Sequence, residues 1–242
     1  MTAEQWARTV RHQLGLGRLL PLGGQRDGAW ISEEAARTVL RSAAEGLSGV
    51  RLGTVRIALA HPEDTREPAV PPPPSALPPG PLRLTAEFEA TPAEPLPVTA
   101  ERLRTALAGA AAGLLGLELD EVDLRVTALL DEDAQPAPVR QPEPPRPAEA
   151  GPGDETLAAA AALAVPGVGA LTGLLGRPVH LGDRETGGGS LPRRHVRVEL
   201  AVGAGRRALD VAREVRAAVA EALPDRPTVA VLVTAVLTQD LP

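Results

Sequence analysis

The clearest hydrophobic pattern in the chain lies at residues 195–237. Strict alternation of apolar and polar residues at 196–202 predicts a half-buried strand. At 206–223 apolar residues recur every three or four positions, which predicts an amphipathic helix, and Pro224 ends it. The β-branched apolar run at 228–237 predicts a strand covered on both faces. The predicted order is strand, helix, strand.

The first half of the chain carries the same periodicities. A helix with one apolar face is predicted at 33–47, followed by a strand at 55–59. After a polar, proline-rich excursion come a strand at 82–89, a helix at 99–115 and a strand at 122–130. The predicted order is helix, strand, strand, helix, strand.

The remaining segments join the halves and complete the second one. Residues 135–152 are rich in Pro, Glu, Arg and Ala, which predicts a semi-rigid linker with polyproline II character. An alanine-rich helix at 155–165 ends at Pro166, and a short strand follows at 178–181. A glycine-rich loop at 187–190 then leads into the final strand-helix-strand unit.

Laid side by side, the two halves show the same order of elements, which indicates an internal repeat. The proline-rich excursion of the first half falls where the glycine-rich loop of the second half falls, as expected of two hairpin tips. The matched segments are 82–86 with 196–200, 103–107 with 215–219, 126–130 with 233–237, and Ser48-Gly49-Val50 with Pro166-Gly167-Val168. The predicted fold is therefore α+β, with two tandem α-β-β-α-β domains, each a small mixed sheet packed by two helices, joined by the proline-rich linker.

The predicted domain boundaries follow from this repeat. They are an N-terminal amphipathic helix and turns at 1–27, a first domain at 28–133 with a proline-rich insertion at 62–81, a linker at 134–152, and a second domain at 153–242. A short strand at 28–31 opens the first domain, and the second domain lacks an equivalent strand.

Three features of this repeat carry a resemblance to a known family. Residues 28–34 read Gly-Ala-Trp-Ile-Ser-Glu-Glu, and the first helix of each half closes on a Gly-Val pair, at 49–50 and at 167–168. A β-β-α-β segment ends each half. In these features the chain resembles the alkaline-shock-protein family of bacterial envelope stress response proteins, over most of its length and in two divergent copies.

The resemblance implies a non-enzymatic protein that associates with the cell envelope and with copies of itself. It implies no cofactor and no catalytic residues. The insertion at 62–81 and the missing opening strand of the second domain depart from the family pattern.

Composition narrows the class of protein further. Of 242 residues, one is Phe, two are Trp and none is Tyr, so Ala, Val and Leu must fill the core. Lys and Asn are absent while Arg, Ala, Gly and Pro abound, which indicates a GC-rich bacterial genome, and the resemblance implies that this bacterium is an actinobacterium. Without cysteine there can be no disulfide and no cysteine-based zinc site. The net charge of −6 argues against electrostatic binding to nucleic acid or anionic lipid.

Two segments bear on contact with a membrane. The basic amphipathic pattern at 2–14 is typical of a helix that either lies on a membrane surface or docks through Trp6 on the following domain. The uncharged stretch at 156–176 has the length of a membrane span, but Pro166 and its alanine-rich composition favour a helix and turn. No signal-peptide pattern is found. We expect a cytoplasmic protein, with peripheral contact to the inner face of the cell membrane through a partner.

Candidate residues for chemistry are few. Five arginines form a local basic cluster that could bind an anion: Arg193, Arg194, Arg197, Arg206 and Arg207. A hairpin could join His180 and His195, which flank the glycine-rich loop, in a metal site. Asp183 or Glu185 would supply its carboxylate, although solvated histidines are the simpler interpretation. No serine lies in a nucleophile elbow. No catalytic, cofactor-binding or metal-binding residue is therefore predicted.

Together, the pattern and the resemblance predict a non-enzymatic scaffold or interaction protein of the alkaline-shock type, connected with envelope stress or homeostasis. Its expected partners are other proteins or copies of itself. The alternative is a regulator that binds a small ligand or nucleic acid through the arginine cluster of the second domain.

Overall fold

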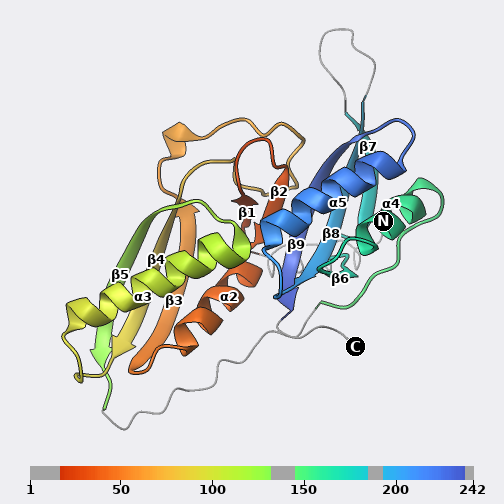
Figure 1. The fold of residues 1–242 in the computed structure, drawn as a ribbon. Coiled ribbons are helices and arrows are strands. Elements are labelled where there is room, and N and C mark those ends of the chain that lie inside the picture. The colour runs from red at the N-terminus through yellow and green to blue at the C-terminus, as the bar shows by residue number, and fades with distance from the viewer. Residues whose placement is uncertain (1–16, 132–144, 185–192, 238–242) are drawn as a thin grey trace, which may run out of the picture.

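The protein forms an α+β fold in a computed structural model, which describes residues 17–131, 145–184 and 193–237 (Figure 1). Within these ranges it contains four α-helices and two mixed β-sheets. The predicted N-terminal helix at 2–14, most of the linker and the glycine-rich loop at 187–190 lie outside the described residues. No helix in the described ranges combines the length and the apolar character needed to span a membrane.

The smaller sheet lies in the first half of the chain. It consists of β3 (Val50–Leu59), β4 (Leu82–Ala90) and β5 (Leu119–Leu129). β4 is central, antiparallel to β3 and parallel to β5. One face packs against α2 (Glu33–Glu45) and α3 (Leu96–Ala110), as Figure 1 shows. Alternate residues of β4 are buried, as its period of two predicted.

Two short helical turns accompany this sheet. A 3-10 turn at Pro62–Asp64 opens the proline-rich insertion. After α3 the chain continues through a π-helical turn at Ala111–Leu115. Gly116 ends it with φ +92°, a left-handed conformation that glycine adopts without a steric penalty. The helix predicted at 99–115 is confirmed, and it begins three residues earlier.

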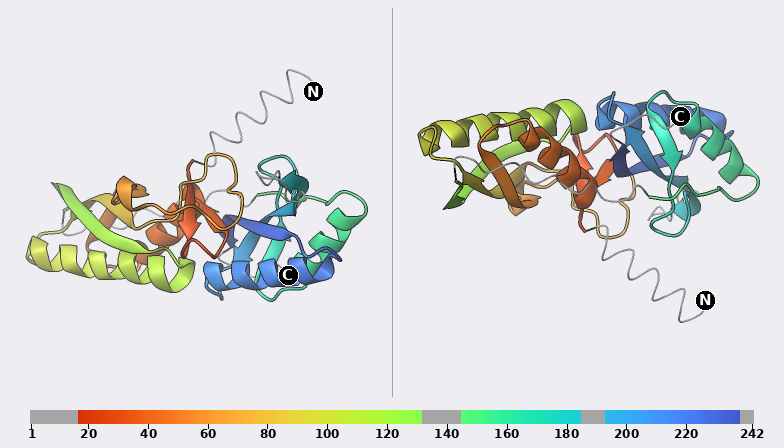
Figure 2. Two further views of the ribbon diagram at one scale, coloured as in Figure 1. Left: turned by 90° about the horizontal axis from the view of Figure 1, so that it is seen from above. Right: turned by 90° about the horizontal axis from the view of Figure 1, so that it is seen from below.

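The larger sheet takes its strands from both halves. They are β1 (Leu19–Leu22), β2 (Ala29–Ser32), β6 (Val168–Leu171), β7 (Val179–Arg184), β8 (Arg193–Gly203) and β9 (Thr228–Leu237). Their order is β1-β2-β9-β8-β6, and β7 also pairs with β8. β8 and β9 are parallel, while β6 and β7 run antiparallel to β8. The helices α4 (Asp154–Leu163) and α5 (Ala208–Ala222) pack on one face (Figure 2).

Strand β2 joins the two halves, because it belongs to the larger sheet although it precedes α2 in the chain. It pairs in parallel with β9, with Ala29 opposite Val231 and Ile31 opposite Val233. The domain boundary predicted at residue 28 groups this strand with the first half, but its hydrogen-bonded neighbour lies in the second half. The sequence did not indicate this pairing, since alternation identifies a strand but not its neighbour. β2 fills the place beside β9 for which the second half has no strand of its own.

Two arginines of α5 attach the turn between β1 and β2 to the second half. Arg216 donates a hydrogen bond to the carbonyl oxygen of Val229 in β9 at 2.9 Å. The same guanidinium donates to the carbonyl oxygens of Arg26, at 2.9 Å, and of Asp27. Arg213 forms an ion pair with the Asp27 carboxylate at 2.8 Å. The turn is therefore held through both its backbone and its side chain.

The two halves repeat one irregularity between their parallel strands. Each has a β-bulge with one extra threonine, Thr127 in β5 and Thr234 in β9. Thr127 Oγ1 donates to the carbonyl oxygen of Phe88 at 3.3 Å. Thr234 Oγ1 donates to that of Leu200 at 3.1 Å. The bulge makes Phe88 of β4 equivalent to Leu200 of β8, so the alignment predicted from the sequence is shifted by two residues. Alternation cannot reveal this error, because a shift of two residues leaves a pattern of period two unchanged.

A second repeated feature follows the first helix of each half. Gly49 and Gly167 adopt left-handed conformations, with φ of +74° and +91°. The carbonyl oxygen of Gly49 accepts a hydrogen bond from the Thr91 amide at 2.9 Å. That of Gly167 accepts one from the Gly203 amide, also at 2.9 Å. The two Gly-Val pairs found in the sequence therefore make the same connection to the end of a neighbouring strand.

Buried apolar side chains form one cluster that runs through both halves. A smaller cluster on the other face of the larger sheet includes Trp30 and Val70. The insertion at 62–81 supplies Val70 and bonds to the first two strands. Trp30 Nε1 donates to the Leu77 carbonyl at 3.2 Å, and the Leu77 amide donates to the Leu19 carbonyl at 2.8 Å. The insertion thus covers part of the larger sheet, which its position as a hairpin tip did not predict.

Replacing Arg216 with Ala is expected to lower the free energy of unfolding by about 2–4 kcal/mol, because three carbonyl oxygens lose a charged donor. Arg104 of α3 makes the equivalent bond to Val122 of β5, at 3.4 Å, and provides the matched control. Arg104→Ala is expected to cost about 1 kcal/mol or less. Urea unfolding followed by tryptophan fluorescence measures both losses, and equal values would contradict the special role of Arg216.

Candidate interaction surface

The five arginines of the predicted anion site do not converge. They are Arg193, Arg194, Arg197, Arg206 and Arg207. The first two begin β8 and the last two follow its other end, roughly 33 Å away at 3.3 Å per residue. Arg194 pairs with Asp154 at 2.7 Å, and Arg206 with Glu214 at 2.6 Å. Arg207 donates to the Ala112 carbonyl at 2.9 Å. Arg194, Arg206 and Arg207 are therefore engaged within the protein, at two separate places.

The two histidines of the predicted hairpin lie on one face of the larger sheet. β7 and β8 pair as expected, with His180 opposite Arg197 and His195 opposite Gly182. His195 Nδ1 lies 2.8 Å from Thr228 Oγ1. Burial and the nearby Arg197 charge lower the pKa of His180. Asp183 pairs with Arg194 and faces the other side of the sheet, and Glu185 lies outside the described residues, so the described residues do not assemble the two-histidine metal site.

A third histidine meets carboxylates that the sequence did not connect with it. His61 Nε2 lies 3.5 Å from Asp120 Oδ2 and 3.7 Å from Glu121 Oε1. Arg83 hydrogen-bonds Glu121, and this bond lowers the pKa of the Glu121 carboxyl. His61 could contribute to a metal site with the two carboxylates. Since Arg83 already neutralises Glu121, the arrangement is better described as an exposed ion-pair network.

Glu199 of β8 carries a carboxyl group with no exposed surface. Its Oε2 accepts a hydrogen bond from the Leu175 amide at 2.9 Å. Its Oε1 lies 3.3 Å from Arg197 Nη2, without hydrogen-bond geometry. Burial raises the pKa of Glu199 to about 7, although the Leu175 amide and the Arg197 charge oppose this rise. Protonated and ionised forms of this carboxyl group are therefore both populated near neutral pH.

The loop at 172–178, between β6 and β7, is built around Glu199. The Thr172 amide donates to the Glu199 carbonyl at 2.9 Å, and the Glu199 amide donates to the Pro178 carbonyl at 2.8 Å, so both ends of the loop are attached to one residue. At the equivalent position of β4 the first half has Glu87, whose side chain is 41% exposed. The loop accounts for the difference in burial.

The raised pKa of Glu199 predicts a dependence of stability on pH. Between the ordinary value of 4.5 and about 7 the folded chain binds more protons than the unfolded chain, so this stabilisation is complete below 4.5 and is lost as the pH rises through about 7. The loss is on the order of 3 kcal/mol. In urea unfolding at a series of pH values, Glu199→Gln should remove this decline while Glu87→Gln keeps it. A wild-type decline in the Glu199→Gln variant would exclude this carboxyl group as its source.

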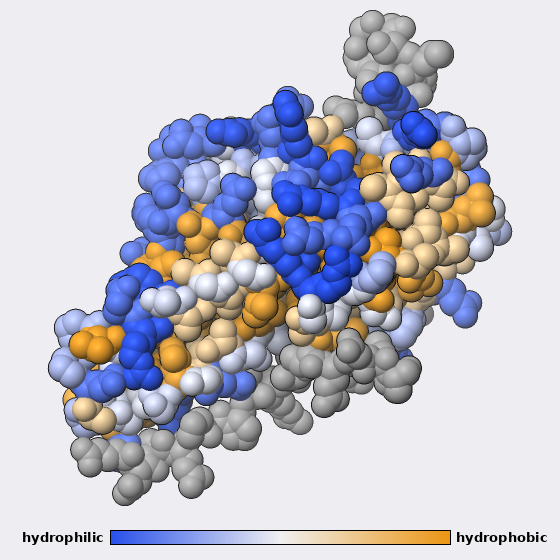
Figure 3. Space-filling view, in the orientation of Figure 1, coloured by the Kyte–Doolittle hydropathy of each residue, from blue (hydrophilic) through white to orange (hydrophobic). Residues whose placement is uncertain are grey.

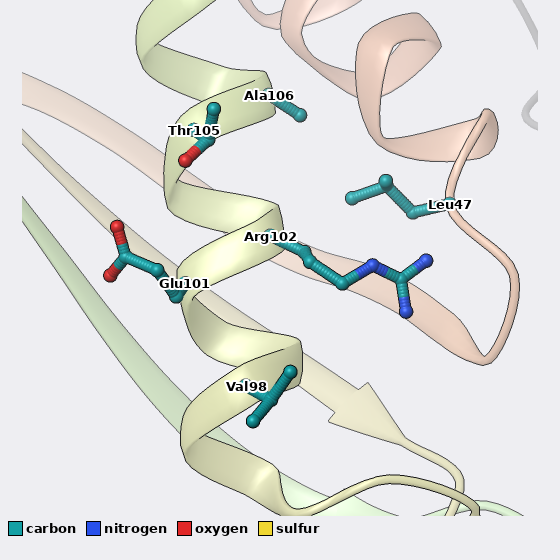
Figure 4. Close-up of a pocket in the computed structure, with 6 residues that line it drawn as sticks. All are labelled: Leu47, Val98, Glu101, Arg102, Thr105 and Ala106. Carbon is teal, nitrogen blue, oxygen red and sulfur yellow. The ribbon is translucent and has the colours of Figure 1, made fainter.

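A shallow groove of about 440 Å³ lies between α3 and the turn after α2 (Figure 4). Val98, Arg102 and Ala106 line it from α3, at the spacing of four that places residues on one helix face. Leu47 faces them from the turn after α2. Val98 is 49% exposed. The space-filling view shows hydrophobic areas bounded by hydrophilic residues on this helical face (Figure 3). Such a groove suits the apolar side chains of a protein partner.

Strand β5 forms the outer edge of the smaller sheet, and β4 is its one strand neighbour within the described residues. Val126 and Leu129 of this strand are 36% and 62% exposed. The bulge equates Val126 with Val233 of β9, which is fully buried. The difference arises because β2 covers the outer edge of β9.

Comparison with models of known protein families and with curated protein sequences gave no match. Function is therefore inferred from the arrangement of these residues.

The groove was hardly predictable from the sequence pattern. Leu47 is predicted to face the core and does pack against it, but it is only partly buried. The predicted helix begins just after Val98. Val98 lies outside the stripe of α3 that is buried, which contains Leu103, Leu107 and Ala110. The available signal for the groove was an apolar residue that lies beside the buried stripe of the helix rather than within it.

Proposed function

We propose that the chain is a non-enzymatic interaction protein of the alkaline-shock type, built from two tandem α-β-β-α-β modules at 28–133 and 153–242. The repeated order of elements supports this proposal. So do the repeated threonine bulges and the repeated glycine turns, because irregularities at matching positions are unlikely to arise independently in unrelated segments.

The two modules differ in how much of their surface is available. The second module has its outer strand β9 covered by β2, and part of its sheet covered by the insertion at 62–81. The first module leaves β5 and the α2–α3 groove exposed. We therefore assign partner binding to the first module and a supporting role to the second.

The groove is the observation that carries this proposal. Val98 and Leu47 present apolar surface to solvent, and Arg102 lies beside them with an ion pair to Glu94 at 2.6 Å. An apolar floor with charges at its rim is typical of a surface that binds an amphipathic segment of another protein. From the family resemblance we propose a partner at the cell envelope.

The alternative regulator that binds an anion through the arginine cluster is less well supported. Arg194 and Arg206 are held by carboxylates, and Arg207 by a carbonyl oxygen. An incoming anion would have to displace these partners at two distant places. We retain the interaction function alone.

The groove predicts where a partner touches the chain. A photo-cross-linking amino acid at Thr105, beside the groove, is expected to capture a discrete protein in cells, with most of it in the membrane fraction. Thr85 is the matched control, since it is equally an exposed threonine but lies on β4, on the sheet face away from the helices.

A second variant ties this capture to the groove. Val98→Asp should reduce capture at Thr105 roughly tenfold, as expected when a central apolar contact is lost. Its effect on stability should stay within about 0.5 kcal/mol because the side chain is half exposed. Equal capture at Thr85 and Thr105, or capture indifferent to Val98→Asp, would reject the proposal.

A further inference from the structure

The edge of the smaller sheet offers a docking site whose occupant can be deduced from its own residues. β9 and β5 are equivalent strands, and β9 receives a neighbour on its outer edge while β5 does not within the described chain. The Val231 amide donates to the Gly28 carbonyl across that edge at 3.0 Å. Leu124 is the equivalent of Val231, so its amide points toward the open edge of β5.

The opposite edge of the same sheet is closed to pairing. On β3, Arg18 donates to the Ile57 carbonyl at 2.8 Å, and the Ile57 amide donates to a Glu33 carboxylate oxygen at 3.5 Å. A bulge between Leu52 and Val55 further interrupts this strand. Side chains and bulges of this kind are how proteins protect an edge strand. β5 is therefore the edge at which this sheet can be extended.

The side chains of β5 separate into two rows. Val122, Leu124 and Val126 stand opposite buried residues of β4 and so face the helices. Asp123 and Arg125 face the other side. Asp123 is 60% exposed and Arg125 is 78% exposed. Their contacts inside the chain are loose, 3.6 Å from Asp123 to Arg83 and 3.9 Å from Arg125 to Glu87.

We propose that β5 pairs antiparallel with β5 of a second copy of the chain, with Leu124 on the twofold axis. In this register Val122 of each copy stands opposite Val126 of the other, on the helix side. Each Asp123 stands opposite an Arg125, on the other side. Opposite charges and apolar pairs across strands are both stabilising.

The charges select this register over its neighbour. A pairing centred on Asp123 would place two carboxylates directly opposite each other, which is destabilising. The pairing centred on Leu124 forms two Asp-Arg pairs instead. An isologous contact of this kind closes on itself and gives a dimer with a six-stranded sheet made from two smaller sheets.

The absence of cysteine from the chain makes the register directly testable. A cysteine introduced by Leu124→Cys meets its own copy at a Cα separation of about 5.5 Å, which a disulfide can bridge. One introduced by Val122→Cys lies roughly 13 Å from its own copy, four residues away along the strand. On mild oxidation of the purified full-length protein, Leu124→Cys should give a covalent dimer and Val122→Cys should not. Equal cross-linking of both, or of neither, would overturn the proposal.

Charge exchange provides an independent test. Arg125→Asp should weaken dimerisation about tenfold in sedimentation velocity, and Asp123→Arg should do the same. The double variant should restore it, because both cross-strand pairs are then reversed together. Arg56 is an exposed residue of β3, so Arg56→Asp is the control and should have no effect on dimerisation. A protein that stays monomeric at all concentrations, or a dimer indifferent to these changes, would refute the pairing.

This inference deepens the proposed interaction function, and the two can fail separately. Partner capture at Thr105 should be measured in the Arg125→Asp background as well. Capture without any dimer in the wild type would leave the groove function standing and remove the β5 pairing. A dimer with the expected cross-link but without partner capture would leave the β5 pairing standing and remove the groove function. A strand from a different protein cross-linked at position 124 would also count against a second copy as the occupant.

Discussion

The pairing of β2 with β9 is the interaction on which the rest of the structure depends. β2 ends at Ser32, and α2 begins at the next residue. The Ser32 hydroxyl oxygen accepts a hydrogen bond from the Ala35 amide at 3.2 Å, which caps α2, and donates one to the Thr234 carbonyl at 3.1 Å. A helix that covers the smaller sheet therefore starts from a strand of the larger one. Neither sheet can be repositioned without moving the other, which explains why the buried core runs through both halves.

That junction also accounts for the difference between the two halves. Arg216 and Arg104 occupy equivalent places, and each binds the carbonyl of an equivalent strand residue. Arg216 has the β1–β2 turn beside it and uses its remaining donors on that backbone. Among the described residues no such turn lies beside Arg104, which bonds Glu101 instead. Equivalent arginines thus lie beside a covered strand edge in the second half and beside an open strand edge in the first half.

The sequence predicted most elements, because burial on one side imposes a period of two on strands and of about three and a half on helices. The strand at 228–237 and the helix at 206–223 were found nearly as they are. Pairing was not predictable in the same way. Nothing in the pattern of residues 28–31 indicates β9 as a neighbour, and nothing in the proline-rich insertion indicates that Val70 is buried on the larger sheet.

The candidate sites were harder to predict for a related reason. Arginines close together in sequence suggest one basic site, but neighbouring residues of a strand point to opposite faces. Arg194 consequently reaches Asp154 on the helix side, while Arg197 lies beside Glu199 on the other. His61 and Asp120 meet only because the insertion and the start of β5 reach the same end of the smaller sheet. Contacts of this range depend on the fold, which residue spacing does not encode.

The two halves share one order of elements and differ in how much of each half is covered by neighbouring segments. In the second half a strand covers the edge of β9, a loop covers Glu199, and an insertion from the first half covers the cluster around Trp30. In the first half the equivalent edge and the equivalent Glu87 stay exposed. A duplicated module that serves only as structural support gains stability from each added cover. A module that binds partners must leave its edge and groove accessible, so the difference in covering is what supports the two roles that we propose.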